Sequence, residues 1–353
     1  MLRRQCLSRL GLLAGLAGGL QARAWGALAL PPSGPLPATW QDSRVLMGTR
    51  VDMSVAAVPE ALAHSAMAAA WQHMTALAAL MSRYEPGNPV DQLALHAGQG
   101  QVLPVPRPLA EVLQAALQRA QDTEGLYDPT VGSYRGWDFR PGQLHVPAAA
   151  ELQGQRTLRG WRHLKLDART QQAWLDRAGV RLDLGGAAKL PILEAGLEVL
   201  REHGIRHALI NGGGDILSLG QAAPDRPWRV ALRDPRQPQR WLGVVDMPAC
   251  GAVLAASGDY ERCFESSGRR CHHILDPRSG EPSRGLHGIA MLGQRVADVN
   301  AWGPAMMVAG PARARRWARG LQGVELLLAG PGEGQGAQAL WASPGWQRKL
   351  QRA

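Results

Sequence analysis

The sequence predicts an α+β fold in which a single integrated domain contains mixed β-sheets flanked by helices. Runs of short strands are interrupted by blocks of helix, which is typical of this class. The chain has 353 residues and is 45% hydrophobic, so it can bury one large core or two modest ones. No internal repeat is visible, and we expect the folded domain to span residues 44–345.

The first 24 residues have the three parts of an export signal. Arg3 and Arg4 precede an apolar run from Leu10 to Leu20, and residues 22–24 form a small-x-small cleavage site. The apolar run is too short to span a bilayer. The arginine pair resembles a twin-arginine signal, with an ordinary secretory signal as the alternative. We therefore expect a periplasmic or exported protein, with a Pro-rich linker at residues 25–43 and no transmembrane helix in the mature chain.

The net charge of +10 does not indicate a nucleic-acid partner. The first 24 residues contain four arginines and no acid, so their removal leaves +6. The remaining basic residues are scattered, apart from a run at roughly helical spacing that is typical of a solvated helix face: Arg313, Arg315, Arg316 and Arg319.

In the first half of the chain, two long helices separate short strands. Residues 45–55 alternate apolar with polar or small side chains, which predicts one strand. An Ala-rich helix is expected from Pro59 to Ser82, and a second helix from Pro108 to Thr123. Beyond them lies a surface segment at residues 142–156, and three short strands are expected at residues 163–167, 173–176 and 180–184.

The second half of the chain is richer in strands. An amphipathic helix at residues 192–203 ends at Gly204, as glycine commonly follows a helix. Strands are expected at residues 208–211, 216–220, 228–232, 242–247 and 286–292, with a hairpin between Val253 and Leu275. Helices near residues 299–309 and 312–319 lead to a last strand at residues 324–329.

The stretch from Leu182 to Lys189 joins an apolar strand to a helix through two glycines, Gly185 and Gly186. Glycine lets the backbone approach a ligand closely, and the free N–H groups at a helix start favour an anion such as phosphate. Tight packing between strand and helix is the alternative explanation. Asp183 and Lys189 place opposite charges on either side of this corner.

Further stretches accompany this corner in a fixed order. They are Met47-Gly-Thr49, Met81-Ser-Arg-Tyr84-Glu-Pro86, Gly125-Leu-Tyr-Asp128-Pro-Thr130-Val-Gly132, Asn211-Gly-Gly-Gly-Asp215, Ser257-Gly-Asp-Tyr-Glu-Arg262 and His272-His-Ile-Leu-Asp-Pro277. Together with Leu182–Lys189, they resemble the FAD:protein FMN transferase (ApbE) family, collinearly from about Met47 to about Gly310. The resemblance implies the ApbE fold and the transfer of FMN from FAD to a Ser or Thr of an acceptor protein, with release of AMP.

The resemblance also implies roles for individual residues. His273 is the candidate catalytic base, because a neutral imidazole can accept a hydroxyl proton near neutral pH. Asp183 and Lys189 would position the flavin diphosphate, and Ser257, Asp259 and Tyr260 would support the site. The other residues implied to bind the flavin are Met47, Tyr84, Asp128, Pro129, Thr130 and Ile274.

A divalent metal ion, expected to be Mg²⁺, is implied as well, because it takes oxygen ligands and binds phosphates. The implied ligands are the carbonyl of Gly186 and an Asp and a Thr of a helical motif. In this chain Asn300 stands at the position of that Asp and Pro304 at that of the Thr. Asp298 is an alternative ligand, although an Asp at a helix start is commonly a cap.

These departures leave two functions open. The first is an FAD:protein FMN transferase acting on a membrane-bound or periplasmic redox subunit. The second is a non-catalytic FAD- or FMN-binding protein of the same fold with a degraded metal site. A dehydrogenase is disfavoured, because Asn211-Gly-Gly-Gly-Asp215 lacks the Gly-x-Gly-x-x-Gly spacing.

Of the four cysteines, Cys6 lies in the predicted export signal. Cys263 and Cys271 flank Ser266-Ser-Gly268 symmetrically and could pair across a hairpin in an oxidising compartment. Cys250 would then remain free.

Overall fold

The centre of the structure is an eight-stranded sheet in which all neighbouring strands are antiparallel. The computed structural model describes residues 28–30, 38–140, 142–237, 239–332 and 338–351. The strands of this sheet are β2 (Thr39–Leu46), β3 (Thr49–Ala56), β7 (Ala208–Gly212), β8 (Asp215–Leu219), β11 (Ala252–Gly258), β14 (Gly288–Gly293), β15 (Glu325–Pro331) and β16 (Gln338–Ala342). Their order across the sheet is β16-β15-β14-β11-β8-β7-β3-β2.

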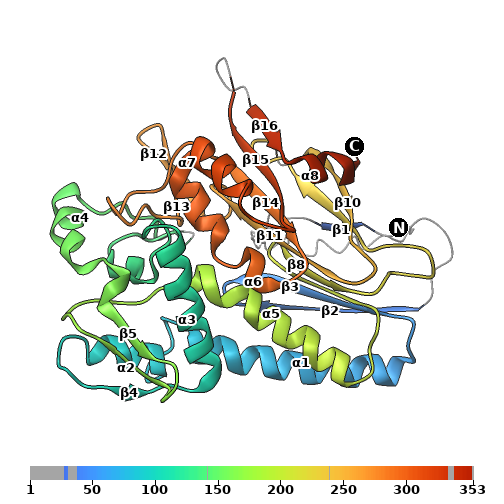
Figure 1. Cartoon of the computed structure of the whole chain (residues 1–353), viewed down its shortest axis with the longest axis horizontal. Coiled ribbons are helices and arrows are strands. Elements are labelled where there is room, and N and C mark those ends of the chain that lie inside the picture. Colours follow the sequence, from blue (N-terminus) through green and yellow to red (C-terminus); the bar gives the residue numbers. More distant parts are fainter. Residues whose placement is uncertain (1–27, 31–37, 141, 238, 333–337, 352–353) are drawn as a thin grey trace, which may run out of the picture.

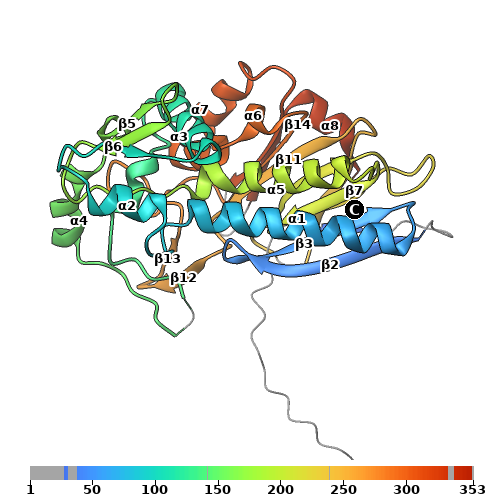
Figure 2. The same cartoon turned by 90° about the horizontal axis from the view of Figure 1, so that it is seen from below.

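Helices cover one face of this sheet. The two longest, α1 (Glu60–Met81) and α5 (Gly185–Glu202), run side by side (Figures 1 and 2). They approach closely at Gly196, where a Cβ atom would lie 2.5 Å from the sulfur of Met74. The short helix α6 (Val296–Val299) and α7 (Trp302–Ala318) pack beside β11 and β14. The N-termini of α5 and α7 are thereby brought to the same end of the sheet.

A second, four-stranded sheet lies against the other face. It consists of β1 (Leu28–Leu30), β9 (Arg229–Arg233), β10 (Trp241–Asp246) and β17 (Leu350–Gln351), with α8 (Pro344–Lys349) beside it. Fully buried side chains of both sheets, such as Ile216 and Val230, form a core there with Trp346. The segment predicted as a linker, residues 25–43, contains β1 and the start of β2, and the second sheet includes β17, beyond the predicted domain end at residue 345.

A smaller lobe packs at the end of the helical layer (Figure 1). It contains α2 (Pro89–Leu95), α3 (Arg107–Asp122), α4 (Ala149–Gln155), the short 3₁₀ turns η1 (Pro129–Ser133), η2 (Arg156–Leu158) and η3 (Trp161–His163), and a sheet of β4 (Leu103–Pro104), β6 (Gln172–Leu175) and β5 (Leu164–Asp167). Its buried side chains belong to the same core as those of α1, α5 and the central sheet. The predicted α+β fold is confirmed.

Two local predictions were wrong. Residues 45–55 form a β-hairpin rather than one strand, because Met47 and Gly48 adopt positive φ angles of 53° and 70° and turn the chain. The strand predicted at residues 180–184 is absent, since the N–H of Asp183 donates to the carbonyl of Pro129 instead of to a neighbouring strand. The segment predicted to lie at the surface, residues 142–156, is mostly exposed and contains α4.

The hairpin predicted within residues 253–275 is β12 (Cys263–Ser266) paired with β13 (Arg269–His272), while β11 belongs to the central sheet. Cys263 lies opposite His272, and Cys271 lies opposite Phe264. Because successive side chains of a strand alternate between faces, the two cysteines point to opposite sides of the hairpin. The pairing considered for them is not formed, and Cys250, Cys263 and Cys271 are free.

The predicted export signal, residues 1–24, lies outside the described residues. Within those residues, no helix combines the length and the apolar character needed to cross a membrane.

Candidate active site

A cavity of about 260 Å³ lies where the N-termini of α5 and α7 meet the β2–β3 turn, the end of β11 and the small lobe. Nine of the twelve predicted site residues line it: Met47, Tyr84, Asp128, Asp183, Gly186, Lys189, His273, Ile274 and Asn300. The other three, Pro129, Thr130 and Asp298, do not line its wall. Segments far apart in the sequence therefore converge on one pocket.

The start of α5 is held by Asp183. One carboxylate oxygen accepts a hydrogen bond from the N–H of Gly185 at 2.9 Å, and the other forms an ion pair with Arg83 Nη1 at 2.8 Å. Arg83 Nη2 also donates to the carbonyl of Gly132 at 3.3 Å. Burial alone would raise the pKa of Asp183, but Arg83 and the Gly185 N–H lower it below its ordinary value. Asp183 is therefore an ionised anchor between α5, α1 and η1.

Lys189 forms the second ion pair of the cavity. Its Nζ lies 2.9 Å from Asp215 Oδ2, and Asp215 Oδ1 accepts the N–H of Ala256 at 2.9 Å. Burial opposes the charge of Lys189, but Asp215 and Glu261 outweigh it and raise its pKa. Lys189 therefore carries its proton at neutral pH.

Glu261 and Arg262 lie between β11 and β12 and also line the cavity. Burial is the main cause that raises the pKa of Glu261 to about 8, so this carboxyl group is mostly neutral at pH 7. Arg262 is exposed, and within the described residues its guanidinium forms no ion pair. Both residues belong to the motif Ser257–Arg262, but the resemblance implied no role for either.

His273 follows β13 on the cavity wall. Its backbone N–H donates to the carbonyl of Arg262 at 3.2 Å, and its side-chain Nδ1 is buried with no hydrogen-bond partner among the described residues. Burial first, and the charges of Arg262 and His272 next, lower the pKa of His273 well below its ordinary value. The imidazole is therefore neutral at pH 7 and can accept a proton.

The neighbouring histidine has a structural role. His272 Nε2 lies 3.0 Å from the carbonyl oxygen of Ser283, and its Nδ1 accepts the N–H of Ile274 at 3.4 Å. Both ring nitrogens are occupied, and only 2% of the residue is exposed. This bonding fixes the chain immediately before and after His273.

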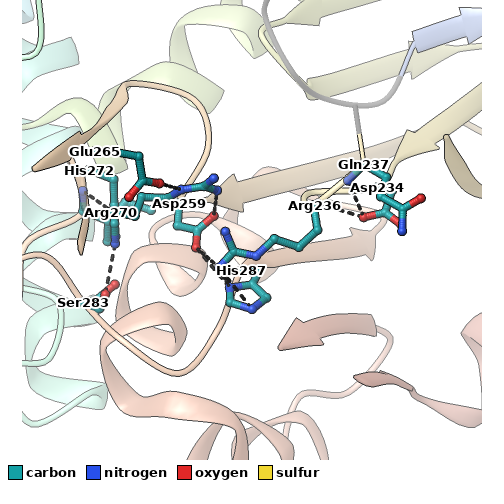
Figure 3. Close-up of polar contacts among 10 residues, drawn as sticks. Asp234, Arg236, Gln237, Asp259, Glu265, Arg270, His272, Ser283 and His287 are labelled. Carbon is teal, nitrogen blue, oxygen red and sulfur yellow. Dashed lines mark hydrogen bonds and ion pairs between the residues drawn. The ribbon is translucent and has the colours of Figure 1, made fainter. Parts of the chain in front are cut away.

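A buried carboxylate, that of Asp259, anchors the hairpin that leads into His272 and His273. Figure 3 shows Asp259 between Arg270 of β13 and His287, which precedes β14. Asp259 accepts from Arg270 Nη1 at 3.4 Å and from Arg236 Nη2 at 3.3 Å, and His287 Nδ1 lies 3.1 Å from its Oδ2. Three separate segments are thus tied to one side chain that is 5% exposed.

Asp259→Asn is expected to lower the free energy of unfolding by about 2 kcal/mol, since an amide replaces the carboxylate that pairs with two arginines. Urea denaturation measures this difference. Asp246→Asn is the matched control, because Asp246 pairs with Arg229 at a more exposed site and its loss is expected to cost about 0.5 kcal/mol. Equal losses in the two variants would contradict the anchoring role of Asp259.

The predicted turn at Asp128 is rigid. Asp128 Oδ1 accepts from the N–H and the hydroxyl of Thr130 at 2.8 and 2.6 Å, and Oδ2 accepts the N–H of Trp161 at 3.0 Å. The Thr130 hydroxyl in turn accepts the N–H of Gly160 at 2.8 Å. Thr130 is fully buried and, like Pro129, shapes the turn from behind the cavity wall.

The residues implied to bind Mg²⁺ do not form a set of oxygen ligands suited to that ion. Asn300 donates its Nδ2 to the carbonyl of Ala187 at 2.9 Å, and Asp298 is paired with Arg295 away from the cavity. The ring of Pro304 packs against Gly186, where a Cβ atom would lie 3.2 Å from Pro304 Cγ. No cluster of three His, Cys, Asp or Glu side chains suited to a metal occurs among the described residues.

Taken together, the fold and the cavity bring positively charged groups and a neutral histidine to one pocket, an arrangement suited to an anionic phosphate ester. The start of α5, the half-buried Lys189 and Arg262 offer positively charged groups, and His273 offers a proton acceptor. The chain belongs to the ApbE family, which it matches over residues 47–328.

Relatives of known name agree with this assignment. The FAD:protein FMN transferase of Rhodobacter capsulatus is 33% identical over 271 residues, covering 75% of this chain and 50% of that protein. This chain thus spans half the length of that relative. The protein of the same name from Klebsiella pneumoniae is 26% identical over 321 residues, covering 89% and 90%. The crystal structure of the ApbE protein from Thermotoga maritima has a TM-score of 0.78 at 25% identity, covering 89% of this chain and 100% of that one.

Proposed function

We propose that this chain is an FAD:protein FMN transferase, which moves FMN from FAD to a serine or threonine of an acceptor protein and releases AMP. The observation that carries the proposal is the neutral imidazole of His273, whose Nδ1 is buried, on the same cavity wall as the start of α5 and Lys189. A base is needed there because the nucleophile is an alcohol, which is weak until it loses its proton.

In the proposed reaction one phosphorus–oxygen bond forms and one breaks. The hydroxyl oxygen of the acceptor attacks the phosphorus on the FMN side of FAD, and the bond to the AMP phosphate breaks. His273 accepts the hydroxyl proton, and AMP departs with the bridging oxygen and its electron pair. Lys189 and the N–H groups at the start of α5 hold the anionic oxygens during the exchange.

The flavin half of FAD is proposed to lie against the apolar part of the cavity. Met47, in the β2–β3 turn, Ile274, after β13, and Tyr84, after α1, line that part. Asp128 would face the flavin from its rigid turn, with Pro129 and Thr130 holding it in place. Asp183 would act through the geometry of α5, since its carboxylate is already bonded to Arg83 and Gly185.

Magnesium dependence is the part of the resemblance that these residues support least. Asn300 and Gly186 offer neutral oxygens, Pro304 offers none, and Asp298 is engaged elsewhere. The proposed steps therefore use only groups of the chain itself.

The acceptor is proposed to be a membrane-bound or periplasmic redox subunit, reached after export. This part of the proposal rests on the signal-like sequence of residues 1–24.

The affinity for FAD is expected to fall as the pH rises through about 8, the raised pKa of Glu261. Below this value the neutral carboxyl group can donate a hydrogen bond to a phosphate oxygen, and above it the carboxylate repels the phosphate. Quenching of flavin fluorescence, measured on both sides of this pH, follows the change. Glu261→Gln keeps a neutral donor and is expected to remove the dependence; identical pH profiles for the two proteins would contradict this role.

The proposed function is tested by incubating the chain with FAD and an acceptor domain and counting both products. Equal amounts of AMP and covalently bound FMN are expected. FAD binding without either product would instead favour the non-catalytic flavin-binding protein.

A further inference from the structure

Some cationic side chains of the cavity form ion pairs with carboxylates, and others do not. Two of its cations already have carboxylate partners, Lys189 with Asp215 at 2.9 Å and Arg83 with Asp183 at 2.8 Å. Each pair contributes no net charge to the cavity. A pyrophosphate bound between them would still need a counter-charge, because burying an unpaired anion is costly.

Arg262 is a cation at this wall without such a partner. Its side chain lines the cavity and forms no ion pair or side-chain hydrogen bond with any residue that the structure describes. Its position is fixed through the backbone, since its carbonyl accepts the N–H of His273 at 3.2 Å. Its charge acts on both His273 and Lys189, the base and the second cation of the proposed site.

The position implied for a metal ion is, by contrast, lined by apolar and hydrogen-bonded side chains. Pro304 and the ring of Tyr127 both lie within 3.2 Å of where a Cβ of Gly186 would be. Asn300, 6% exposed, uses its amide to bind α5. Neither Asn300 nor Pro304, the residues at the implied ligand positions, offers a carboxylate to a divalent ion.

We infer that this chain binds the pyrophosphate of FAD without a divalent metal ion, and that the guanidinium of Arg262 supplies the counter-charge. The inference rests on the proposed function, because it takes FAD as the ligand. Guanidinium suits the role, since it stays charged and can donate two parallel hydrogen bonds to phosphate oxygens.

The first test is the dissociation constant of FAD, measured on the full chain by quenching of flavin fluorescence. It is compared after treatment with EDTA and during a titration with MgCl₂. The expected result is the same dissociation constant in both conditions, within about twofold. A tenfold or greater gain in affinity with MgCl₂ would overturn the inference and leave the proposed function intact. No binding of FAD in either condition would contradict the proposed function itself.

The second test replaces Arg262 with alanine. FAD affinity is expected to fall by about 10- to 100-fold, the size of a lost charge-assisted hydrogen bond. Arg269→Ala, on the hairpin that follows Arg262 but outside the cavity, is the control and should bind FAD as wild type does. Riboflavin, which has no phosphate, should bind Arg262→Ala and wild type equally. An equal loss of riboflavin and FAD affinity would show a structural role for Arg262 and overturn the inference.

Discussion

His273→Ala is expected to lower the rate of FMN transfer by about 10²- to 10⁴-fold, the range over which a positioned general base contributes. FAD should still bind, because Lys189 and the start of α5 are untouched. The rate is measured as covalent FMN on the acceptor under single-turnover conditions, and FAD affinity by fluorescence. His273→Gln, which keeps polarity and much of the volume, should be as slow as the alanine variant. Transfer at the wild-type rate in either variant would contradict the role of His273 as base.

The pH dependence of the wild-type rate separates a base from a structural residue. Burial and nearby Arg262 hold the pKa of His273 well below its ordinary value, so the active neutral form persists as the pH falls below 7. In a plot of rate against pH, the fall in rate caused by protonation of His273 should therefore occur below pH 6.5, the ordinary histidine pKa. The residual activity of His273→Ala should not show this fall.

Lys189→Met is expected to lower the free energy of unfolding by roughly 3 kcal/mol, because Asp215 is left in the interior without its cation. FAD affinity should fall as well, since the lysine is proposed to hold the phosphates. Thermal or urea denaturation measures the first effect and fluorescence the second.

The double variant Lys189→Met with Asp215→Asn separates these two effects. It removes both charges, so most of the lost stability should return, while FAD affinity should remain low. A single variant as stable as wild type would contradict the pairing of Lys189 with Asp215. Recovery of FAD affinity in the double variant would contradict the binding role of Lys189.

Most of the fold is predictable from the spacing of apolar residues along the sequence. Residues 59–82 and 108–123 were predicted as helices, and α1 and α3 lie there because their apolar residues repeat at helical spacing. The β2–β3 hairpin was missed because Met47-Gly48 is not a common turn pair, although Met47 adopts the positive φ that asparagine more often takes. Residues 180–184 look like a strand, but their partner is the turn at Pro129, which no local pattern reveals.

Sequence motifs predict several residues of the candidate site, but they do not predict its ion pairs. His273, Asp183 and Lys189 were found by resemblance, and the structure places all three on one cavity. Their partners Arg83 and Asp215 come from other elements, so the ion pairs depend on tertiary contacts. The same holds for Glu261 and Arg262, whose roles follow from burial and from the lack of a partner.

The altered metal motif was visible in the sequence as Asn300 and Pro304. The sequence did not show whether a metal ion could still be bound, because a shifted helix start would have allowed Asp298 to reach the cavity. The structure places Asp298 in α6, paired with Arg295, and puts the ring of Pro304 against Gly186.

The most direct test of the account is the intact mass of an acceptor domain, one whose threonine is known to carry FMN, after incubation with this chain and FAD. The acceptor should gain the mass of one FMN, with one AMP released per acceptor, and the same domain with that threonine changed to alanine should gain nothing. Tight FAD binding with no mass gain on the intact acceptor would contradict the transferase.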